Sequence, residues 1–186
     1  KSVDLAFCPE RTVEGKALKE LRYLPQIIGG ISRKSSLRAS TLFNFITPTV
    51  VTVSCPETAE MIKMIDNTYR DVSFAFSNEI AHACDASGVS SIEVINAGKL
   101  GYDRTNLFLP GPVGGPCLSK DTHILSQSVA EFGGQVEISM SARKLNEELP
   151  NKIASYIKML LDKSNKRREF LKISLLGIAF KGRPET

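Results

Sequence analysis

The sequence has little of what metal sites and disulfide-bonded scaffolds need. Its two histidines are not clustered, and its four cysteines lie far apart with no C-x-x-C pair: Cys8, Cys55, Cys84 and Cys117. This spacing argues against a zinc site and against a small disulfide framework. We therefore expect reduced thiols, no bound metal and a cytoplasmic protein.

The sequence also lacks features of membrane and nucleic-acid binding proteins. No apolar run approaches the roughly 20 residues of a membrane helix, and we recognise no signal peptide. The net charge of +4 is too small to indicate a nucleic-acid partner. Repeats and low-complexity segments are absent, and 42% hydrophobic with 24% charged residues is typical of a folded globular protein.

Short apolar and β-branched segments near the N-terminus are separated by one helical pattern. Strands are expected over 3–7, 26–30 and 50–54, and a helix over 35–45. A strand, a helix and a strand in this order predict part of an α/β sheet domain. The apolar segment 171–180 predicts another buried strand. We expect apolar surface to be exposed at both ends, and the chain to be a piece of a longer one.

From Pro56 the pattern becomes helical and continues until Gly88. Proline followed by acidic residues suits a helix start. The apolar residues then recur at three- and four-residue spacing: Met61, Ile65, Tyr69, Val72, Phe76, Ile80 and Ala83. A helix of about 30 residues is about 45 Å long, which favours an interdomain spine or a dimer seam. Further helices are expected over 91–97, 118–132 and 138–161, with an irregular loop over 98–116.

A glycine-rich loop, residues 111–117, leads directly into one of these helices. Glycines let backbone amides approach a ligand closely. Cys117 stands at the helix start, where unpaired N–H groups and the helix dipole favour the reactive thiolate. Lys120 adds positive charge there, and Asp121 follows it. The competing interpretation is a structural cysteine beside a turn, and the residues alone leave both open.

Two further pairs of polar residues are candidates for chemistry. Lys63 and Asn67 lie four apart, so they share one face of the long helix. Glu10 and Glu14 follow the end of a predicted strand, where open α/β sheets place their ligands. Taken alone, each pair is more simply explained as part of a solvated surface.

Together these segments resemble the UDP-glucose/GDP-mannose dehydrogenase family of nucleotide-sugar 6-dehydrogenases. The resemblance rests on the order and spacing of five motifs: Cys8-Pro9-Glu10-Arg11-x-x-Glu14-Gly15, Ala59-Glu60-x-x-Lys63-x-x-x-Asn67, Asn78-Glu79, Gly114-Gly115-x-Cys117-x-x-Lys120-Asp121 and Gly177-x-Ala179-Phe180-Lys181. It implies an α/β protein with a mainly α-helical central domain and a long spine helix, flanked by partial Rossmann-like pieces.

The resemblance also implies a domain division. Residues 1–55 would be the last part of an NAD-binding Rossmann domain, 56–165 a helical domain for dimerisation and catalysis, and 166–186 the start of a UDP-sugar-binding domain. No G-x-G-x-x-G follows a strand here, so most of the NAD-binding part would be absent and this chain alone would be inactive.

The family's chemistry can be carried over residue by residue. NAD would be the cofactor, and Cys117 would capture the C6 aldehyde of a UDP-sugar as a thiohemiacetal and then a thioester. The other catalytic candidates are Lys63, Asn67, Asp121 and Glu14. Substrate contacts are implied for Glu10, Arg104, Leu107, Phe108, Gly114 and Lys181, and cofactor contacts for Glu14 and Lys120. The resemblance further implies a homodimer formed through the long helix.

A few residues bear on the choice of substrate and on the competing classes of protein. Pro9-Glu10-Arg11 is more similar to members that oxidise UDP-N-acetylhexosamines, such as UDP-N-acetylmannosamine or UDP-N-acetylglucosamine, than to UDP-glucose members. A noncatalytic dimerisation module of the same fold is disfavoured, because the catalytic positions are filled. A cysteine hydrolase is disfavoured because His123, six residues after Cys117, is interpreted as a helix-surface or packing residue.

Overall fold

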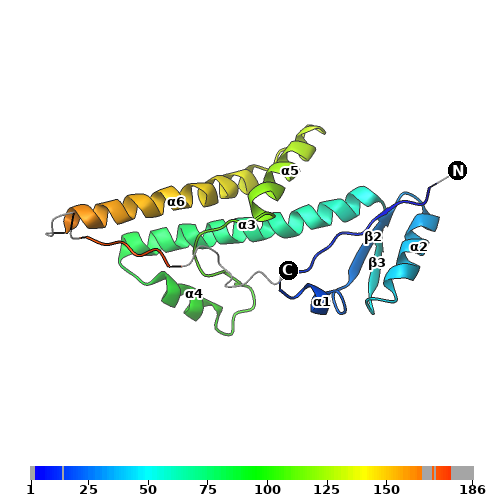
Figure 1. Ribbon diagram of the computed structural model, residues 1–186, viewed down its shortest axis with the longest axis horizontal. Helices are drawn as coiled ribbons and strands as arrows, with labels where there is room; N and C mark the ends of the chain where they lie inside the picture. The colour runs from blue at the N-terminus through cyan, green and yellow to red at the C-terminus, as the bar shows by residue number, and fades with distance from the viewer. Residues whose placement is uncertain (1–2, 14, 165–168, 170, 177–186) are drawn as a thin grey trace. The chain divides into compact units, whose positions relative to one another are not determined.

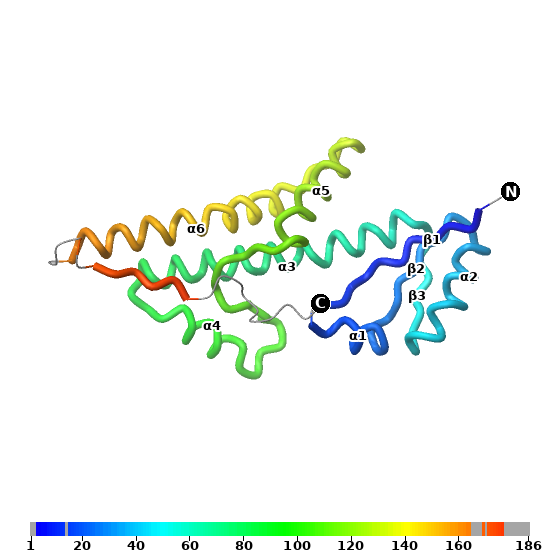
Figure 2. The backbone as a smooth tube through the Cα atoms, in the orientation of Figure 1, coloured from blue at the N-terminus to red at the C-terminus, as the bar shows by residue number. Residues whose placement is uncertain are grey.

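The computed structural model describes residues 3–13, 15–164, 169 and 171–176, and these fall into two compact units. Of the described residues, one unit contains those up to Lys63 together with 173–176, and the other contains those between Met64 and Lys172. Their secondary structure is traced in Figures 1 and 2. The described elements are mainly helical with a small sheet, as the sequence predicted.

A three-stranded sheet organises the first unit. The strands β1 (Ala6–Phe7), β2 (Gln26–Gly30) and β3 (Val50–Val53) lie in that order, with β1 antiparallel and β3 parallel to β2. The helix α2 (Arg33–Phe43) connects β2 to β3, and a one-turn helix α1 (Ala17–Glu20) precedes β2. The predicted strand–helix–strand order is therefore confirmed, whereas α1 was missed.

The end of β2 packs tightly on the start of α2. Ser32 caps the helix by accepting a hydrogen bond from the Ser35 backbone N–H (3.1 Å), and the buried Ser36 hydroxyl accepts one from Gly30 N–H (3.1 Å). A Cβ on Gly30 would lie 2.5 Å from the Ser36 backbone nitrogen. The glycine therefore permits this close approach of strand and helix.

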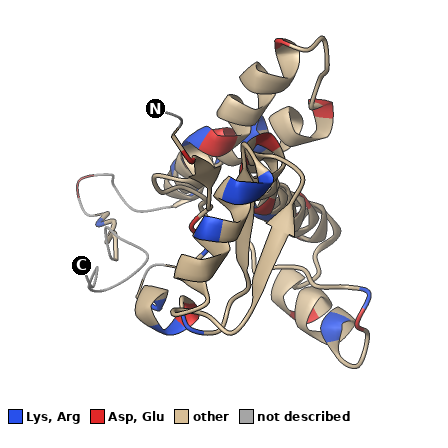
Figure 3. Cartoon of the chain, turned by 90° about the vertical axis from the view of Figure 1, so that its right-hand side faces the viewer, with Lys and Arg blue, Asp and Glu red and all other residues tan. Residues whose placement is uncertain are grey.

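Basic residues lie along α2, including its first turn, where they oppose the helix dipole (Figure 3). Asp4 offsets this charge by pairing with Arg38 and with Lys34 (3.4 Å). The hydrogen bond from Arg38 is the main cause of a lowered pKa for the Asp4 carboxyl. The segment before β1 is thereby attached to α2.

The second unit contains four helices, and the first of them begins in the other unit. They are α3 (Pro56–Ser87), α4 (Ser91–Lys99), α5 (Leu118–Ala130) and α6 (Glu137–Lys163). The predicted long helix from Pro56, its end at Gly88 and the loop before Cys117 are all found. Gly88 has a φ of +70°, a left-handed conformation that favours glycine at a helix end.

The two predicted terminal strands are largely wrong. Only Ala6–Phe7 of 3–7 is a strand, and residues 171–176 form none. A strand requires hydrogen-bonded neighbours, and no described residue pairs with 171–176. The expected exposure of apolar side chains is confirmed, since Leu175 and Leu176 are 87% and 93% exposed. The part of that prediction on 177–180 lies outside the described residues.

Candidate functional site

Cys117 is an exposed thiol at the start of α5. It occupies the N-cap position, and its carbonyl accepts hydrogen bonds from the backbone N–H groups of Lys120 (3.2 Å) and Asp121 (3.0 Å). Gly115, two residues earlier, has a φ of +93°. The chain therefore turns sharply into the helix, as a glycine-rich loop allows, and leaves the thiol accessible to a ligand.

One turn after Cys117, a buried carboxylate of α5 is hydrogen-bonded to α3. Asp121 is 2% exposed, and it accepts a hydrogen bond from Asn67 Nδ2 at 2.6 Å and one from the ammonium of Lys120. The bond to Asp121 is the main cause of a raised pKa for Lys120, with a smaller contribution from Cys117. Four predicted site residues are thus brought together: Asn67, Cys117, Lys120 and Asp121.

Glu10 and Lys63 form a second group, within the first unit. The Lys63 ammonium lies 3.7 Å from the Glu10 carboxylate, which also accepts a hydrogen bond from the Thr12 backbone N–H. Burial opposes ionisation of Glu10, but the hydrogen bond from Thr12 and the charge of Lys63 outweigh it and lower its pKa. At neutral pH Glu10 is therefore a carboxylate, and it lies beside the Lys63 side chain.

Two predicted substrate residues line one pocket of the second unit. The pocket, of about 320 Å³, lies between α3 and the loop that follows α4. Arg104 and Leu107 form part of its wall, opposite Tyr69 and Phe76 of α3. Arg104 also lies over the ring of Tyr102, 4.6 Å from its centroid. The pocket joins a cation to apolar walls, a combination that suits an anionic ligand with an apolar face.

Other predicted substrate and catalytic residues lie elsewhere. Phe108 stacks on Phe74 of α3, with ring centroids 4.5 Å apart, and is not part of that pocket wall. Gly114 lies in open space, where a Cβ would meet no atom within 4 Å. Glu14 and Lys181 lie outside the described residues.

Comparison with known proteins places this arrangement in a family. Residues 57–148 match the model of the UDP-glucose/GDP-mannose dehydrogenase family, central domain. A UDP-N-acetyl-D-mannosamine dehydrogenase of Methanococcus vannielii is 36% identical over 186 residues, which is 100% of this chain and 42% of that protein. The chain belongs to the UDP-glucose/GDP-mannose dehydrogenase family.

Solved structures support the same assignment to the UDP-glucose/GDP-mannose dehydrogenase family. A UDP-D-ManNAc dehydrogenase from Pyrococcus horikoshii superposes with a TM-score of 0.80 at 34% identity, covering 87% of this chain and 38% of that one. An NDP-N-acetyl-D-galactosaminuronic acid dehydrogenase from Methanosarcina mazei gives 0.76 at 31%, covering 88% and 37%. The chain therefore spans less than half the length of these members.

The buried polar network of this family member was missed by the sequence analysis. Asp71 of α3 is completely buried and accepts hydrogen bonds from Arg143 Nη1 (2.9 Å) and Asn146 Nδ2 (2.8 Å), both of α6. A signal was present, because Asn67, Asp71 and Asn78 are polar positions spaced by four and seven residues. Polar side chains at this spacing share one helix face, which indicates contact with a polar partner.

Neither a metal site nor a membrane segment is found in the part of the chain that the structure describes. No group of three or more metal-binding side chains occurs among the described residues. None of their helices is both long and apolar enough to cross a membrane.

Proposed function

We propose that the protein oxidises the C6 hydroxymethyl group of a UDP-N-acetylhexosamine to a carboxylate, with NAD as the oxidant. UDP-N-acetylmannosamine and UDP-N-acetylglucosamine are the favoured substrates. The similarity to relatives named UDP-N-acetyl-D-mannosamine dehydrogenase extends over the whole of this chain and supports this choice. Because the chain spans 42% of their length, the activity is proposed for the protein that the complete coding sequence specifies.

The observation that carries this proposal is the exposed Cys117 thiol at the α5 N-terminus. Its immediate neighbours are a cation, Lys120, and a buried carboxylate, Asp121. An accessible cysteine sulfur at this position is suited to attack an aldehyde carbon. Covalent capture keeps the aldehyde on the enzyme between the two oxidations.

In the proposed reaction, the Cys117 sulfur forms a bond to C6 of the aldehyde, and the carbonyl oxygen becomes a negatively charged oxyanion. The ammonium of Lys63 and the amide of Asn67 stabilise that charge. An amide nitrogen carries two hydrogens, so the bond from Asn67 to Asp121 leaves one for this role. After the second oxidation, water cleaves the C–S bond of the thioester and releases the carboxylate and the thiol.

The acidic residues are proposed to position water and to accept protons. Asp121 and Glu14 hold the hydrolytic water and take up its proton, with Glu10 nearby. The position of Glu10, 3.7 Å from the Lys63 ammonium, supports its place near the proposed oxyanion.

NAD, when bound, accepts the hydride in each oxidation. Among the described residues, Lys120 fits an anionic cofactor, since its side chain is 58% exposed and its pKa is raised by the bond to Asp121. Glu14 is the second proposed cofactor residue. Arg104, Leu107, Phe108, Gly114 and Lys181 are proposed to bind the UDP-sugar, for which a guanidinium and an ammonium suit the diphosphate.

The division into domains and the cellular location are part of the same proposal. Residues 1–55 would belong to the NAD-binding domain, 56–165 to the helical domain and 166–186 to the UDP-sugar-binding domain. All four cysteines are free thiols, which supports a cytoplasmic location.

Measuring NADH tests this function. Protein expressed from the complete coding sequence is mixed in parallel with UDP-N-acetylmannosamine, UDP-N-acetylglucosamine and UDP-glucose, and NADH is followed by absorbance. We expect two NADH per sugar with one of the acetylated sugars, because covalent capture joins two oxidations. A turnover confined to UDP-glucose would refute the substrate assignment, and no NADH with any sugar would refute the function.

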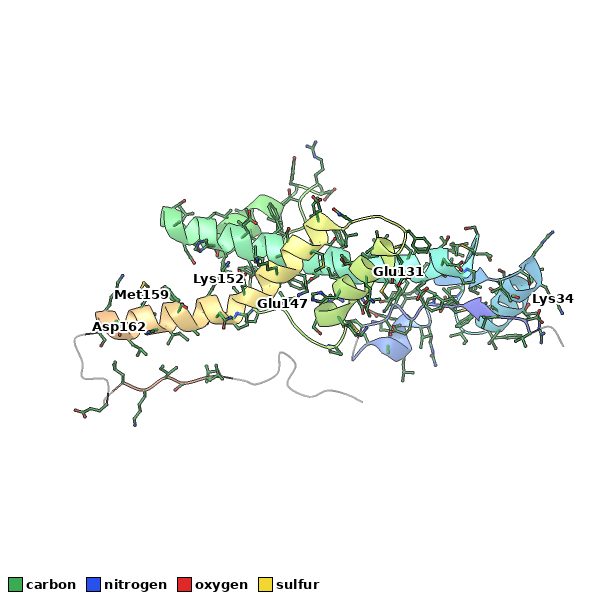
Figure 4. All side chains as sticks on the ribbon, turned by 90° about the horizontal axis from the view of Figure 1, so that it is seen from above. Lys34, Glu131, Glu147, Lys152, Met159 and Asp162 are labelled. Carbon is green, nitrogen blue, oxygen red and sulfur yellow. The ribbon has the colours of Figure 1, made fainter. Side chains whose placement is uncertain are left out.

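A homodimer through the helical domain is the proposed assembly. The apolar stripe of α3 supports it, because Ile65 and Tyr69 are 51% and 63% exposed instead of buried in the core of the unit. The second half of α6, along Lys152, Met159 and Asp162 in Figure 4, contains no buried residue either. Exposed apolar stripes of this kind are typical of protein interfaces.

Charges in the α3 stripe should separate the proposed dimer. We expect the double variant Ile65→Lys, Tyr69→Lys to sediment as a monomer, because a buried lysine without a partner opposes association. The control is Leu37→Lys on α2, an equally exposed leucine of the other unit, which should leave the dimer intact. Analytical ultracentrifugation decides the matter, and a wild-type monomer at micromolar concentration would contradict the proposal.

A further inference from the structure

The loop that carries Cys117 is attached to the helices at both of its ends. At its first residue, Asn78 of α3 donates to the Gly111 carbonyl (3.1 Å) and accepts from the Gly111 N–H (2.8 Å). Gly111 stands between Pro110 and Pro112, which have no N–H group. Within Pro110-Gly111-Pro112, Gly111 is thus the one residue with a backbone N–H, and the Asn78 amide binds both that N–H and the Gly111 carbonyl.

At the other end of the loop, Arg143 of α6 fixes the first turn of α5. Its Nη1 donates to the carbonyl of Leu118, the residue after Cys117, at 2.8 Å. The same nitrogen donates to Asp71 at 2.9 Å, and the side chain is 2% exposed. Asp71 in turn accepts from the Thr122 hydroxyl in the next turn of α5, at 3.3 Å. A buried charge-assisted bond of this kind is stronger than an exposed one.

The two attachments are connected through Asn146. Its Oδ1 accepts from Asn78 at 3.2 Å, and its Nδ2 donates to the Asp71 carboxylate at 2.8 Å and to the Asp71 carbonyl at 2.9 Å. All four side chains are buried: Asp71, Asn78, Arg143 and Asn146. One continuous network from α3 and α6 thus holds residue 111 and residue 118.

Between these two ends, the bonds that hold the loop are short-range ones to α5, from the Ser119 N–H (3.3 Å) and hydroxyl (2.7 Å) to the Gly115 carbonyl. Gly114, Gly115, Pro116 and Cys117 are exposed, and a Cβ on either glycine would meet no atom within 4 Å. The position of the thiol therefore depends on where the ends are fixed. A displacement of about 1 Å in a reacting group is enough to slow a reaction strongly.

We propose that Asn78 and Arg143 are positioning residues, which hold the Cys117 loop at both ends so that the thiol captures the aldehyde before it escapes. The role in capture rests on the proposed function, whereas the role in holding the loop does not. Neither residue needs to touch the substrate. Loosening the loop should therefore lower kcat and the yield of the second oxidation more than it changes KM for the sugar nucleotide, to which Gly114 is the one proposed contact in this loop.

The first test is local hydrogen exchange in Asn78→Leu, a replacement of similar shape that cannot bond to Gly111. It needs neither substrate nor cofactor. Mass spectrometry of the peptide spanning 111–121 should show exchange at least about tenfold faster than in wild type. Peptides from α4 should be unchanged, which separates a loosened loop from general unfolding. The matched control is Asn151→Leu, at an exposed asparagine of α6.

The second test is the number of NADH formed per sugar consumed, measured with an aldehyde trap present. The ratio should fall from two toward one in Asn78→Leu, because the released aldehyde misses the second oxidation. A smaller folded fraction would lower the rate but not this ratio. In Arg143→Lys the ratio should stay nearer two than in Arg143→Met, because a single nitrogen makes both bonds of Arg143 and an ammonium can replace it.

The outcomes separate the two proposals. Faster exchange in 111–121 together with a lower NADH ratio supports the positioning role. Unchanged exchange in Asn78→Leu, or a ratio that stays at two despite faster exchange, overturns it. If wild type forms no NADH with any sugar, the proposed function fails, and hydrogen exchange alone decides whether the network holds the loop.

Discussion

If the proposed function holds, replacing Cys117 with serine should lower the rate of carboxylate formation by at least about 10³-fold, because the proposed reaction would lose its nucleophile. Serine keeps the size of the side chain at the α5 N-cap but presents a hydroxyl, which is far less nucleophilic than a thiolate at neutral pH. The first oxidation does not need the sulfur. A slow release of aldehyde, with one NADH per sugar, is therefore the expected residual activity.

Cys8→Ser is the matched control for this variant. Burial raises the pKa of the Cys8 thiol, so this cysteine is disfavoured as a thiolate. We expect the control to retain wild-type turnover and the normal ratio of two NADH per sugar. Full carboxylate production by Cys117→Ser would refute the covalent role, whereas loss of activity in both variants would indicate a general dependence on thiols.

The sequence was sufficient for the longer helices, because several of their ends have strong local signals, whereas the one-turn helix α1 was missed. Pro56 and Gly88 bound α3, and Ser90, which accepts a hydrogen bond from the Glu93 N–H, caps α4. These signals act within a few residues and do not depend on the rest of the protein. Strand boundaries depend on a partner, and this explains why 3–7 was predicted too long and 171–176 was predicted wrongly.

The face that each helix buries could not be predicted in the same way. The period of α3 identifies residues that share a face, but it does not say which face meets the rest of the unit. Ile65 and Tyr69 are exposed, while Asn67, Asp71 and Asn78 are buried. Hydrophobicity normally selects the inner face. Here hydrogen bonds to α5 and α6 satisfy the buried polar groups and make the opposite arrangement stable.

Local patterns could group the residues of the candidate site only where these are close in sequence. Cys117, Lys120 and Asp121 share a helix start, and Lys63 with Asn67 share a helix face. Arg143, by contrast, reaches Leu118 across 25 positions of sequence. Such a contact depends on the packing of α6 against α5, which no local pattern specifies.

Removing the Asp71 carboxylate should be the most destabilising single change in the network. Asp71 is 0% exposed, and Arg143, Asn146 and Thr122 all donate to its side chain. Asp71→Ala leaves a buried guanidinium without its main partner, and breaking a buried pair in this way costs about 3–5 kcal/mol. We expect a loss of this size in the free energy of unfolding, measured by urea denaturation at pH 7.

Two comparisons show whether the loss comes from the buried charge. Asp85→Ala, at an exposed carboxylate of the same helix, should change stability by less than about 0.5 kcal/mol. The double variant Asp71→Leu, Arg143→Met should be more stable than Asp71→Ala, because it removes the unpaired cation together with its partner. If the double variant is instead the less stable of the two, the arginine stabilises the protein mainly through its bond to Leu118, and α5 depends on that bond more than on the ion pair.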